Sequence, residues 1–598
     1  MSGIAAPARW TEMGARASGW PSSGRTVCYI AVFALTAGLV LAPLVVLLLT
    51  SLNAGPIAEP GLGVSLGNYT DAWSSSTTYA TLANTLVFAF GSTCVAVLIG
   101  VFFAFMVERT DMPWKTFAYV AITSTLAMPG MLYGIAWLLL ISPRIGLFNV
   151  ALLKLFARED GLLTSWAGVG LTDAPIQPYG MAGMIVVEGL RGVGLVFLIT
   201  VGLFRNMDAA LEEAAAVSGA TTRTVISRIT MRLMIPGILA AAVYIFAQTL
   251  DAFEIPAVMG LQAGVFVLST KIFLLVKNEE HGLASALGVC FVAIAVLLVL
   301  WYGRLTRRVE RFATVTGKGF RPRTLRIGRF RYVGLAVVAI YFAVVVLAPF
   351  LVLVWASLLP FYQVPSALML SRLTLKAYRY VFTDPWGVTA LKNTLILVLT
   401  VPAATMLLAT LISWFVVKTH TPGRRLLDVL AFVPQVSPSI ITALAFIYLF
   451  LTVPLKLIPI YGTIWIIAIA MISNLLPYGT RTMHGAALQI HKELEEAALA
   501  GGVAWGKTFR YVILPLLFPA MISGWVFIAM AAIRFVTLPL LLYSPNSRVV
   551  SLLMWDNWQG GEIGKAAATG VVLMVAIGLV TLAGRLVDQR RAGRLAAG

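Results

Sequence analysis

Apolar residues occur in long runs along the whole chain, and short polar or basic segments separate them. About 12 of these runs hold roughly 20 residues or more, which is enough for a helix to cross the ~30 Å hydrocarbon core of a bilayer. The pattern therefore predicts an all-α membrane protein. The predicted spans are residues 28–51, 80–106, 117–141, 180–204, 233–255, 283–303, 332–358, 389–417, 428–452, 463–483, 516–536 and 565–587.

The sequence on the two sides of a basic central segment repeats itself. Asn-Thr-Leu begins at both Asn84 and Asn393, and Glu-Ala-Ala begins at both Glu213 and Glu496. Because each half has six predicted spans, we expect two tandem six-helix domains related by a pseudo-two-fold axis along the membrane normal. The predicted parts are a tail at 1–27, a first domain at 28–303, a linker at 304–331, a second domain at 332–587 and a tail at 588–598.

Alternating the spans across the membrane collects the basic segments on one side. These segments include the 205–232 loop, the 484–515 loop, the linker and both tails. Since Lys and Arg are enriched in cytoplasmic loops, we expect this side and both termini to face the cytoplasm. The linker is expected to lie against anionic lipid headgroups.

The composition agrees with a membrane protein and limits the chemistry. Hydrophobic residues make up 59% of the 598 residues and charged residues 12%, about half the fraction of a soluble domain. The loops on the predicted cytoplasmic side account for the net charge of +19, so no nucleic-acid partner is expected. The cysteines lie in or near spans and the histidines are scattered, so neither a metal site nor a catalytic residue is expected.

Two long loops on the predicted cytoplasmic side carry the most informative motif. Each begins with a segment rich in Ala and Glu, residues that favour a helix. A glycine, Gly219 or Gly502, follows the Glu-Ala-Ala run at the same spacing, where a helix can end. A second helical stretch then leads into the next span. Each loop is therefore expected to form a helix, a glycine corner and a short second helix that protrude from the membrane.

These loops resemble the EAA motif of the permease subunits of binding-protein-dependent ABC importers. That motif reads Glu-Ala-Ala, three residues, Gly, nine residues, then Ile-x-Leu-Pro. The second loop follows the motif to its end, with Leu514 and Pro515 in the closing positions, whereas the first lacks this pair after Ile229. Two copies at equivalent positions of the repeat make the resemblance specific.

The resemblance implies a multi-pass permease of the bacterial inner (plasma) membrane. In that family the motif forms the coupling helix, which seats in a groove of a separate ATP-binding subunit. It implies two copies of that subunit for each chain, ATP and magnesium bound by that partner and no cofactor bound by this chain. It also implies a periplasmic or lipid-anchored substrate-binding protein. The expected ATPase-docking residues are Glu213, Ala214, Ala215, Gly219, Glu496, Ala497, Ala498 and Gly502, with Glu213 and Glu496 also expected to hold each loop together by capping or pairing with Arg.

The fusion of two halves is most similar to the ferric-iron group of these permeases, so ferric iron is the expected cargo. Permeases for thiamine, 2-aminoethylphosphonate and polyamines are close relatives and remain the alternatives, because specificity resides mainly in the binding protein. Outside the family, the rival is a gradient-driven secondary transporter, which has no use for two docking loops. A polytopic enzyme finds no support, since the sequence offers no nucleophile–base or metal constellation.

Charged residues inside the predicted spans mark a candidate pathway, because a charge in a membrane is costly. Glu188 and Arg191 are spaced to pair on one helix face, and a self-neutralising structural pair is the alternative to a transport role. Asp251 and Arg534 occupy equivalent positions of the repeat. Their opposite charges predict an outer gate in which they meet directly or through water, and a contact with the substrate and a structural ion pair between the halves are the alternatives. The pathway candidates are Asp251, Glu254, Arg534, Glu188, Arg191 and Asn474.

Overall fold

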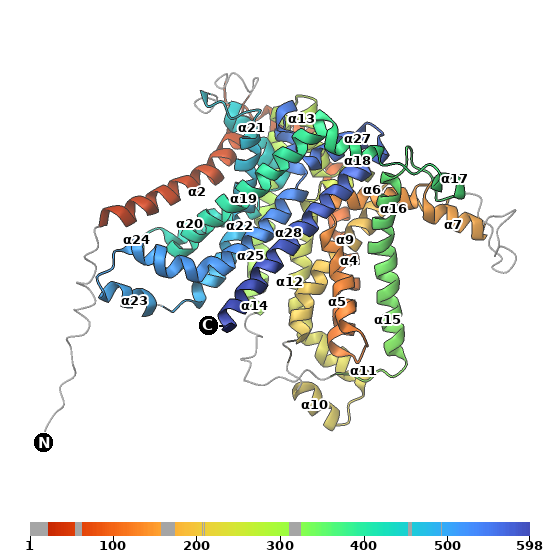
Figure 1. Cartoon of the computed structure of the whole chain (residues 1–598), viewed down its shortest axis with the longest axis horizontal. Coiled ribbons are helices and arrows are strands. Elements are labelled where there is room, and N and C mark those ends of the chain that lie inside the picture. The colour runs from red at the N-terminus through yellow and green to blue at the C-terminus, as the bar shows by residue number, and fades with distance from the viewer. Residues whose placement is uncertain are drawn as a thin grey trace.

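The computed structural model describes residues 22–53, 63–156, 174–205, 207, 210–309, 324–451, 457–491 and 493–597. Within these ranges the chain is built from helices, and its extended pairings are two isolated bridges, Asn53 with Val64 and Thr110 with Leu325. The helices fall into two halves that repeat one arrangement (Figure 1).

The first half extends from α2 to α14. Its elements are α2 (Ser22–Ser51), α3 (Gly67–Ser74), α4 (Ser76–Arg109), α5 (Lys115–Thr123), η1 (Ser124–Ala127), α6 (Gly130–Ile141), α7 (Leu147–Phe156), α9 (Met181–Arg205), α10 (Ala210–Val217), α11 (Thr222–Val225), η2 (Ile226–Thr230), α12 (Met231–Leu250), η3 (Pro256–Gly260), η4 (Leu261–Ala263), α13 (Leu268–Lys277) and α14 (His281–Val309).

The second half extends from α15 to α28. Its elements are α15 (Phe330–Tyr341), η6 (Phe342–Leu347), α16 (Ala348–Ser357), α17 (Ala367–Leu370), α18 (Lys376–Thr383), α19 (Pro385–Lys418), α20 (Arg424–Phe432), η7 (Val433–Gln435), α21 (Ser439–Leu451), α22 (Ile464–Gln489), α23 (Glu493–Ala500), α24 (Trp505–Thr508), η9 (Phe509–Ile513), α25 (Leu514–Arg534), α26 (Thr537–Leu542), η10 (Pro545–Ser547), α27 (Val550–Gln559) and α28 (Ile563–Ala597).

Two of the predicted spans are bent. In the described chain, 10 helical segments are long and apolar enough to cross a membrane, and they coincide with the other predicted spans. The apolar runs 117–141 and 428–452 instead form two helices each, joined at 101° in the first half and at 108° in the second. A third bent pair, Pro256–Ala263 with Leu268–Lys277, turns through 75° and follows the fifth span. Bends of this size make each pair a broken span or a re-entrant segment.

Prolines at equivalent positions explain the first two bends. Pro129 immediately precedes α6, and Pro438 immediately precedes α21. A proline lacks the backbone N–H of a helix and disfavours helical geometry in the residue before it. Met128 accordingly has an extended backbone, with φ −88° and ψ 126°. The prolines interrupt each helix at the same place in the repeat and leave free helix ends inside the protein.

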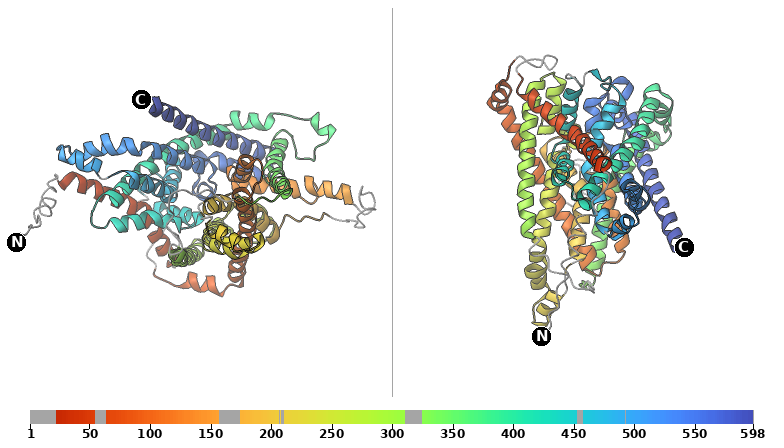
Figure 2. Two further views of the ribbon diagram at one scale, coloured as in Figure 1. Left: turned by 90° about the horizontal axis from the view of Figure 1, so that it is seen from below. Right: turned by 90° about the vertical axis from the view of Figure 1, so that its left-hand side faces the viewer.

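The first helix of each half packs on the other half. Helix α2 lies against α20 and α21 of the second half, and Figure 2 shows it crossing the teal helices of that half. Helices α15 and α16 lie against α5 and α6 of the first half. Tyr29 donates a hydrogen bond to the Pro422 carbonyl at 2.9 Å, and Tyr362 donates one to the Leu139 carbonyl at 2.8 Å. These exchanged helices join the two halves into one body.

Small residues allow the main helices of the first half to pack closely. Helix α4 packs along α9, where Gly100 lies against Val196 and Gly189 lies against Val95. A Cβ atom added at either glycine would overlap the facing valine. Close approach through small residues is the usual way that membrane helices gain contact, because lipid provides no hydrophobic driving force between them.

Candidate functional site

The two loops that carry the Glu-Ala-Ala motif have the same fold. The first loop (residues 210–230) contains α10, α11 and the π-helical turn η2, and it continues into α12. The second loop (residues 493–513) contains α23, α24 and the π-helical turn η9, and it continues into α25. In Figure 1, α10 and α23 lie away from α13 and α27, which occupy the opposite end of the molecule.

The glycine corner of each loop is a helix stop. Gly219 has a φ of +84° and Gly502 a φ of +71°, a backbone conformation that glycine adopts without strain. After the corner, the N–H of Ala220 donates to the Ala215 carbonyl at 3.0 Å, and the N–H of Val503 donates to the Ala498 carbonyl at 3.0 Å. This is the Schellman arrangement that closes a helix at a left-handed residue. The predicted helix–glycine–helix form is therefore confirmed in both loops.

The first loop is fastened to the helical body by a buried carboxylate. Glu212 forms an ion pair with Arg109, and both side chains are almost completely buried. Thr230 also donates a hydrogen bond to Glu212, at 2.6 Å. Because Arg109 ends α4 and Thr230 ends η2, these bonds connect the loop to the second span and to the start of α12.

The structure corrects the role expected for Glu213 within the loop. We expected Glu213 and Glu496 to hold the loops together, but both side chains are exposed. The ion pair is made instead by the neighbouring Glu212, which points inward because residues next to each other on a helix face different directions. Ala214 and Ala497 are exposed too, and Ala215 and Ala498 are half-buried, so each motif presents small and acidic groups to its surroundings.

Aromatic rings take the corresponding place beneath the second loop. Trp505 packs against Trp414 with a distance of 5.1 Å between ring centroids, and against Phe509 with a distance of 6.0 Å. Trp414 lies on α19, so these rings join the second loop to the helix that corresponds to α4. Lys418, at the repeat position of Arg109, donates to the Ile490 carbonyl just before the loop. Each loop is thus anchored, the first by an ion pair and the second by stacked rings.

The predicted partners Asp251 and Arg534 contact different helix ends. Asp251 accepts hydrogen bonds from the backbone N–H of Ser439 at 2.8 Å and from its hydroxyl at 2.9 Å. Arg534 donates to the Leu126 carbonyl at 3.1 Å. Each side chain therefore reaches a bent pair of the other half. Direct pairing of the two, as expected for an outer gate, is not the arrangement in this conformation.

A group of charged side chains surrounds the bend in the first half. Arg191 pairs with Glu188, with Nη2 and Oε1 separated by 2.5 Å, so the predicted pair is confirmed. The Glu254 carboxylate lies against the first turn of α6, next to the backbone of Gly130 and Met131. It also lies so close to Gly130 that a Cβ atom there would overlap it. A side chain at this position would have to displace the carboxylate.

The second half has polar but mostly uncharged groups around its bend. Asn474, which replaces Arg191 in the repeat, is buried on α22. A small cavity of about 40 Å³ lies beside Asp251 and is lined in part by Gln435 and Ser437. The two bends therefore differ in charge although their backbones correspond. Among the described residues, no group of three or more His, Cys, Asp and Glu side chains is placed to hold a metal ion.

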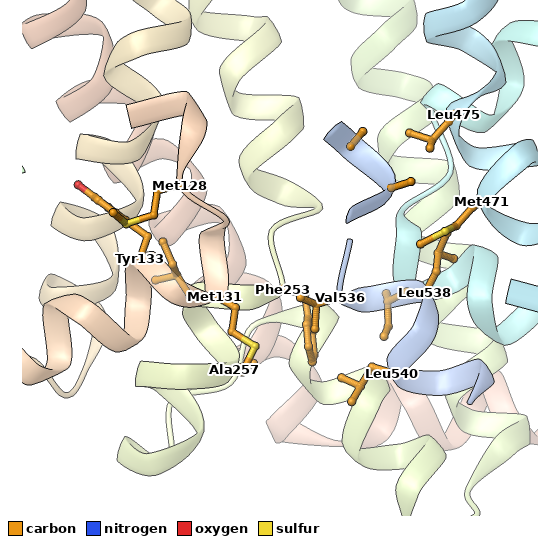
Figure 3. Packing of buried hydrophobic residues seen from close by; sticks show 14 of the residues in the cluster. Met128, Met131, Tyr133, Phe253, Ala257, Met471, Leu475, Val536, Leu538 and Leu540 are labelled. Atoms are coloured by element: carbon orange, nitrogen blue, oxygen red, sulfur yellow. The ribbon is translucent and has the colours of Figure 1, made fainter. Parts of the chain in front are cut away.

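Apolar side chains fill the centre between the two bends. Figure 3 shows Phe253 and Val536 in this cluster, together with Met131 and Ala257 of the first half and Leu538 and Leu540 of the second. Phe253 lies 5.4 Å from Phe273 and 6.2 Å from Trp555 between ring centroids, and these last two rings come from α13 and α27. Rings from both halves thus close the centre in this conformation.

The sequence did not predict the residues that anchor the first loop, nor the helix ends that Asp251 and Arg534 contact. Arg109, Glu212 and Thr230 each look like ordinary residues at the edge of a span or loop. The signals available were the position of Arg109 directly after an apolar run and the pair of adjacent Glu residues at 212 and 213. The Ser439 and Leu126 contacts depend on where the bends lie, and hydropathy does not show a bend.

Comparison with known proteins identifies the repeated unit. The family model described as the binding-protein-dependent transport system inner membrane component matches residues 96–311 and 404–593. Each match contains one complete loop, and together they cover more than half of the chain. The chain belongs to this family. This permease therefore contains two tandem copies of the family's membrane domain, and a binding-protein-dependent transport family does not favour the gradient-driven carrier considered above.

Several curated relatives resemble this permease. The ferric transport system permease protein FbpB of Actinobacillus pleuropneumoniae is 25% identical, over 68% of this chain and 58% of that protein. The putative ferric transport system permease protein FbpB 1 of Haemophilus influenzae is 26% identical, over 62% of this chain and 58% of that protein. The matched region thus spans less than two thirds of the length of either relative. A probable ABC transporter permease, y4fN of Sinorhizobium fredii, is 22% identical over 85% of this chain and 87% of its own.

Relatives with other cargoes also match. The CysT permease of a sulfate transport system in Salmonella typhimurium is 30% identical over 26% of this chain and 59% of that protein. A solved bacterial alginate ABC transporter, in complex with an alginate pentasaccharide-bound periplasmic protein, is 20% identical with a TM-score of 0.36. It covers 42% of this chain and 84% of the solved chain. The names of the sequence relatives thus agree on a transport permease and differ on the substrate.

Proposed function

We propose that this permease forms the substrate pathway of an ABC importer that carries ferric iron. Two separate ATPase subunits bind ATP and magnesium and dock on the first and second loops. A binding protein delivers the substrate at the opposite end of the molecule. The pathway alternates between outward and inward access as the ATPase subunits associate and separate. The chain lies in the bacterial inner membrane with both termini in the cytoplasm.

The observation that carries this proposal is the common fold of the two loops. Each presents a helix that ends at a left-handed glycine, with an exposed glutamate and small residues on its surface. A surface of small residues allows a partner to approach the backbone closely, and an exposed carboxylate attracts a basic partner. Both loops continue directly into long apolar helices, α12 and α25, so a movement of either loop reaches the membrane interior.

Ferric iron is proposed because the first relatives named above are ferric transport permeases. The matched sulfate permease indicates that related membrane domains serve other cargoes in other proteins. Thiamine, 2-aminoethylphosphonate and polyamines remain the alternatives from the sequence. The binding protein determines which cargo is delivered, because the family shares one membrane fold among many substrates.

A test of docking uses the glycine corners. In Gly219→Val and Gly502→Val, a β-branched side chain is forced into the left-handed region, which strains the backbone by about 1–2 kcal/mol. We expect ATPase recovered in a pull-down to fall about tenfold, with the larger loss for Gly502→Val because the second loop follows the motif to its end. Gly578→Val is the matched control, since it lies within helix α28 where a Cβ meets nothing within 4 Å.

The two parts of the proposal can fail separately. If both corner variants recover ATPase and transport at the parental level, the loops are not the docking sites. Cargo is tested in proteoliposomes that contain the permease, its ATPase and its binding protein. We expect ATP-dependent accumulation of radiolabelled ferric iron, and accumulation of sulfate in its place would contradict the assignment of cargo but not that of the importer.

A further inference from the structure

The helix that leaves each loop ends in a charged residue that binds the opposite half. Helix α12 follows the first loop, and Asp251 caps its end; α25 follows the second loop and ends at Arg534. We call the bonds from Asp251 to Ser439 and from Arg534 to the Leu126 carbonyl the crossed contacts. Each crossed contact is made at the break of a bent pair in the other half.

The sign of each charge matches the helix end that it binds. Ser439 is the first residue of α21, whose free N–H groups carry partial positive charge, and it binds the carboxylate of Asp251. Leu126 lies in the short helix η1 just before the break, where free carbonyl groups carry partial negative charge, and it binds the guanidinium of Arg534. The opposite charges at equivalent positions are thus explained by the helix ends, without direct contact between the two residues.

Each loop is connected to its crossed contact by continuous structure. In the first half, Thr230 holds Glu212 of the loop and the next residue begins α12. In the second half, α24, η9 and α25 follow one another without a gap, and Trp505 and Phe509 stack within this segment. A continuous helical segment therefore extends from each loop to the bent pair of the other half.

We infer that the crossed contacts transmit the movement of each loop to the opposite half of the permease. When an ATPase subunit shifts the first loop, α12 and Asp251 pull on the start of α21. When the other subunit shifts the second loop, α25 and Arg534 pull on the end of η1. This inference rests on the proposed docking of ATPase subunits on the two loops. It makes Asp251 and Arg534 positioning residues that act on the bent pairs.

The test measures transport and ATP hydrolysis together in the reconstituted importer. Asp251→Asn and Ser439→Ala each weaken the first crossed contact, and Arg534→Gln weakens the second. We expect each variant to retain ATPase recruitment and to hydrolyse ATP within about twofold of the parental rate. Substrate moved per ATP should fall about tenfold, as expected for the loss of a charge-assisted hydrogen bond. Asp251→Asn combined with Ser439→Ala should cost less than the sum of the two single effects, because both changes weaken the same contact.

Exchanging the two charges separates the crossed contacts from a direct gate. In a permease with both Asp251→Arg and Arg534→Asp, each charge faces a helix end of its own sign. We expect this double variant to transport no more substrate than the less active of Asp251→Arg alone and Arg534→Asp alone. Recovery above both single variants would overturn the inference, because only a direct pair is preserved by the exchange.

Two controls make the outcome specific. Glu280→Gln and Arg372→Gln change exposed side chains by the same chemistry and should transport at the parental level. Single variants at Asp251 and Arg534 that move as much substrate per ATP as the parent would also overturn the inference. Failure of the parental permease to bind the ATPase would contradict the proposed function itself. A separate pull-down measures this.

Discussion

Two adjacent carboxylates in the first loop have opposite surroundings. Glu212 is buried against Arg109 and accepts a hydrogen bond from Thr230, whereas Glu213 is exposed. A buried ion pair costs little only while both partners remain, because loss of one leaves the other charge unpaired in a poorly solvated place. The two residues therefore report on different properties, one on the attachment of the loop and the other on its surface.

Matched substitutions at these positions should separate stability from docking. Glu212→Gln leaves the buried Arg109 without its counter-charge, so we expect a loss of about 3–5 kcal/mol in loop attachment and a lower unfolding temperature in detergent. Glu213→Gln should leave that temperature unchanged and weaken ATPase recruitment. Thermal unfolding and pull-down of the same two proteins check this. Equal unfolding temperatures for both variants would show that the ion pair does not hold the loop.

The sequence allowed only part of this site to be predicted. The motif located Gly219 and Gly502 correctly as helix stops, because a backbone conformation that requires glycine leaves a mark in the sequence. It assigned the anchoring role to Glu213, because the choice between neighbouring glutamates depends on which one faces the end of α4. That orientation is a property of packing between distant segments, which one sequence does not record.

At the scale of the helices, the bends at Pro129 and Pro438 create the internal helix ends that polar side chains bind. Each apolar run was long enough to be a span, so hydropathy alone predicted one helix where the structure has two. The repeated prolines were visible in the sequence, but a proline is also compatible with a kinked span. The polar partners at the breaks, which include Glu254 and Asp251, come from distant segments of the chain, so the hydropathy pattern does not show them.

A glycine at the first bend tests the importance of these partners. Gly130→Ala places a Cβ atom where the Glu254 carboxylate lies, so the carboxylate must leave the start of α6. We expect transport to fall about tenfold, with normal abundance in the membrane, since the carboxylate loses its interaction with the positive end of α6. Gly134→Ala is the control, because its Cβ would meet Ile255 and Val258 at an ordinary 3.6 Å. Parental transport by Gly130→Ala would show that the cap is dispensable.

At the scale of the whole molecule, the repeat predicted the architecture well. The recurrence of short motifs predicted two tandem domains with the same orientation in the membrane. The family model matches once in each half. The exchange of α2 and α15 between the halves was not predicted. A helix that packs on a distant part of its own chain has the same hydropathy as one that packs nearby, so the pattern contains no signal for the exchange.

The presence of both loops in one chain predicts the composition of the importer. One permease should bind two ATPase subunits, and native mass spectrometry of the detergent-solubilised complex measures this directly. Gly502→Val should shift the population toward one bound subunit, because the first loop remains intact, while Gly578→Val should retain two. A parental complex that holds one ATPase subunit at saturating concentration would contradict this expectation.

The opposite charges of the crossed contacts bear on how the two halves can recognise each other. If the halves were separate proteins, two copies of the first half could associate, and Asp251 would then meet the bend at Gly130, where Glu254 already occupies the helix end. Two carboxylates would compete for one set of N–H groups and repel each other. Two copies of the second half would bring a guanidinium to each bend and no carboxylate to either. Covalent fusion places one first half and one second half in every permease molecule. The charges at the equivalent positions 251 and 534 could therefore become opposite without pairing of identical halves.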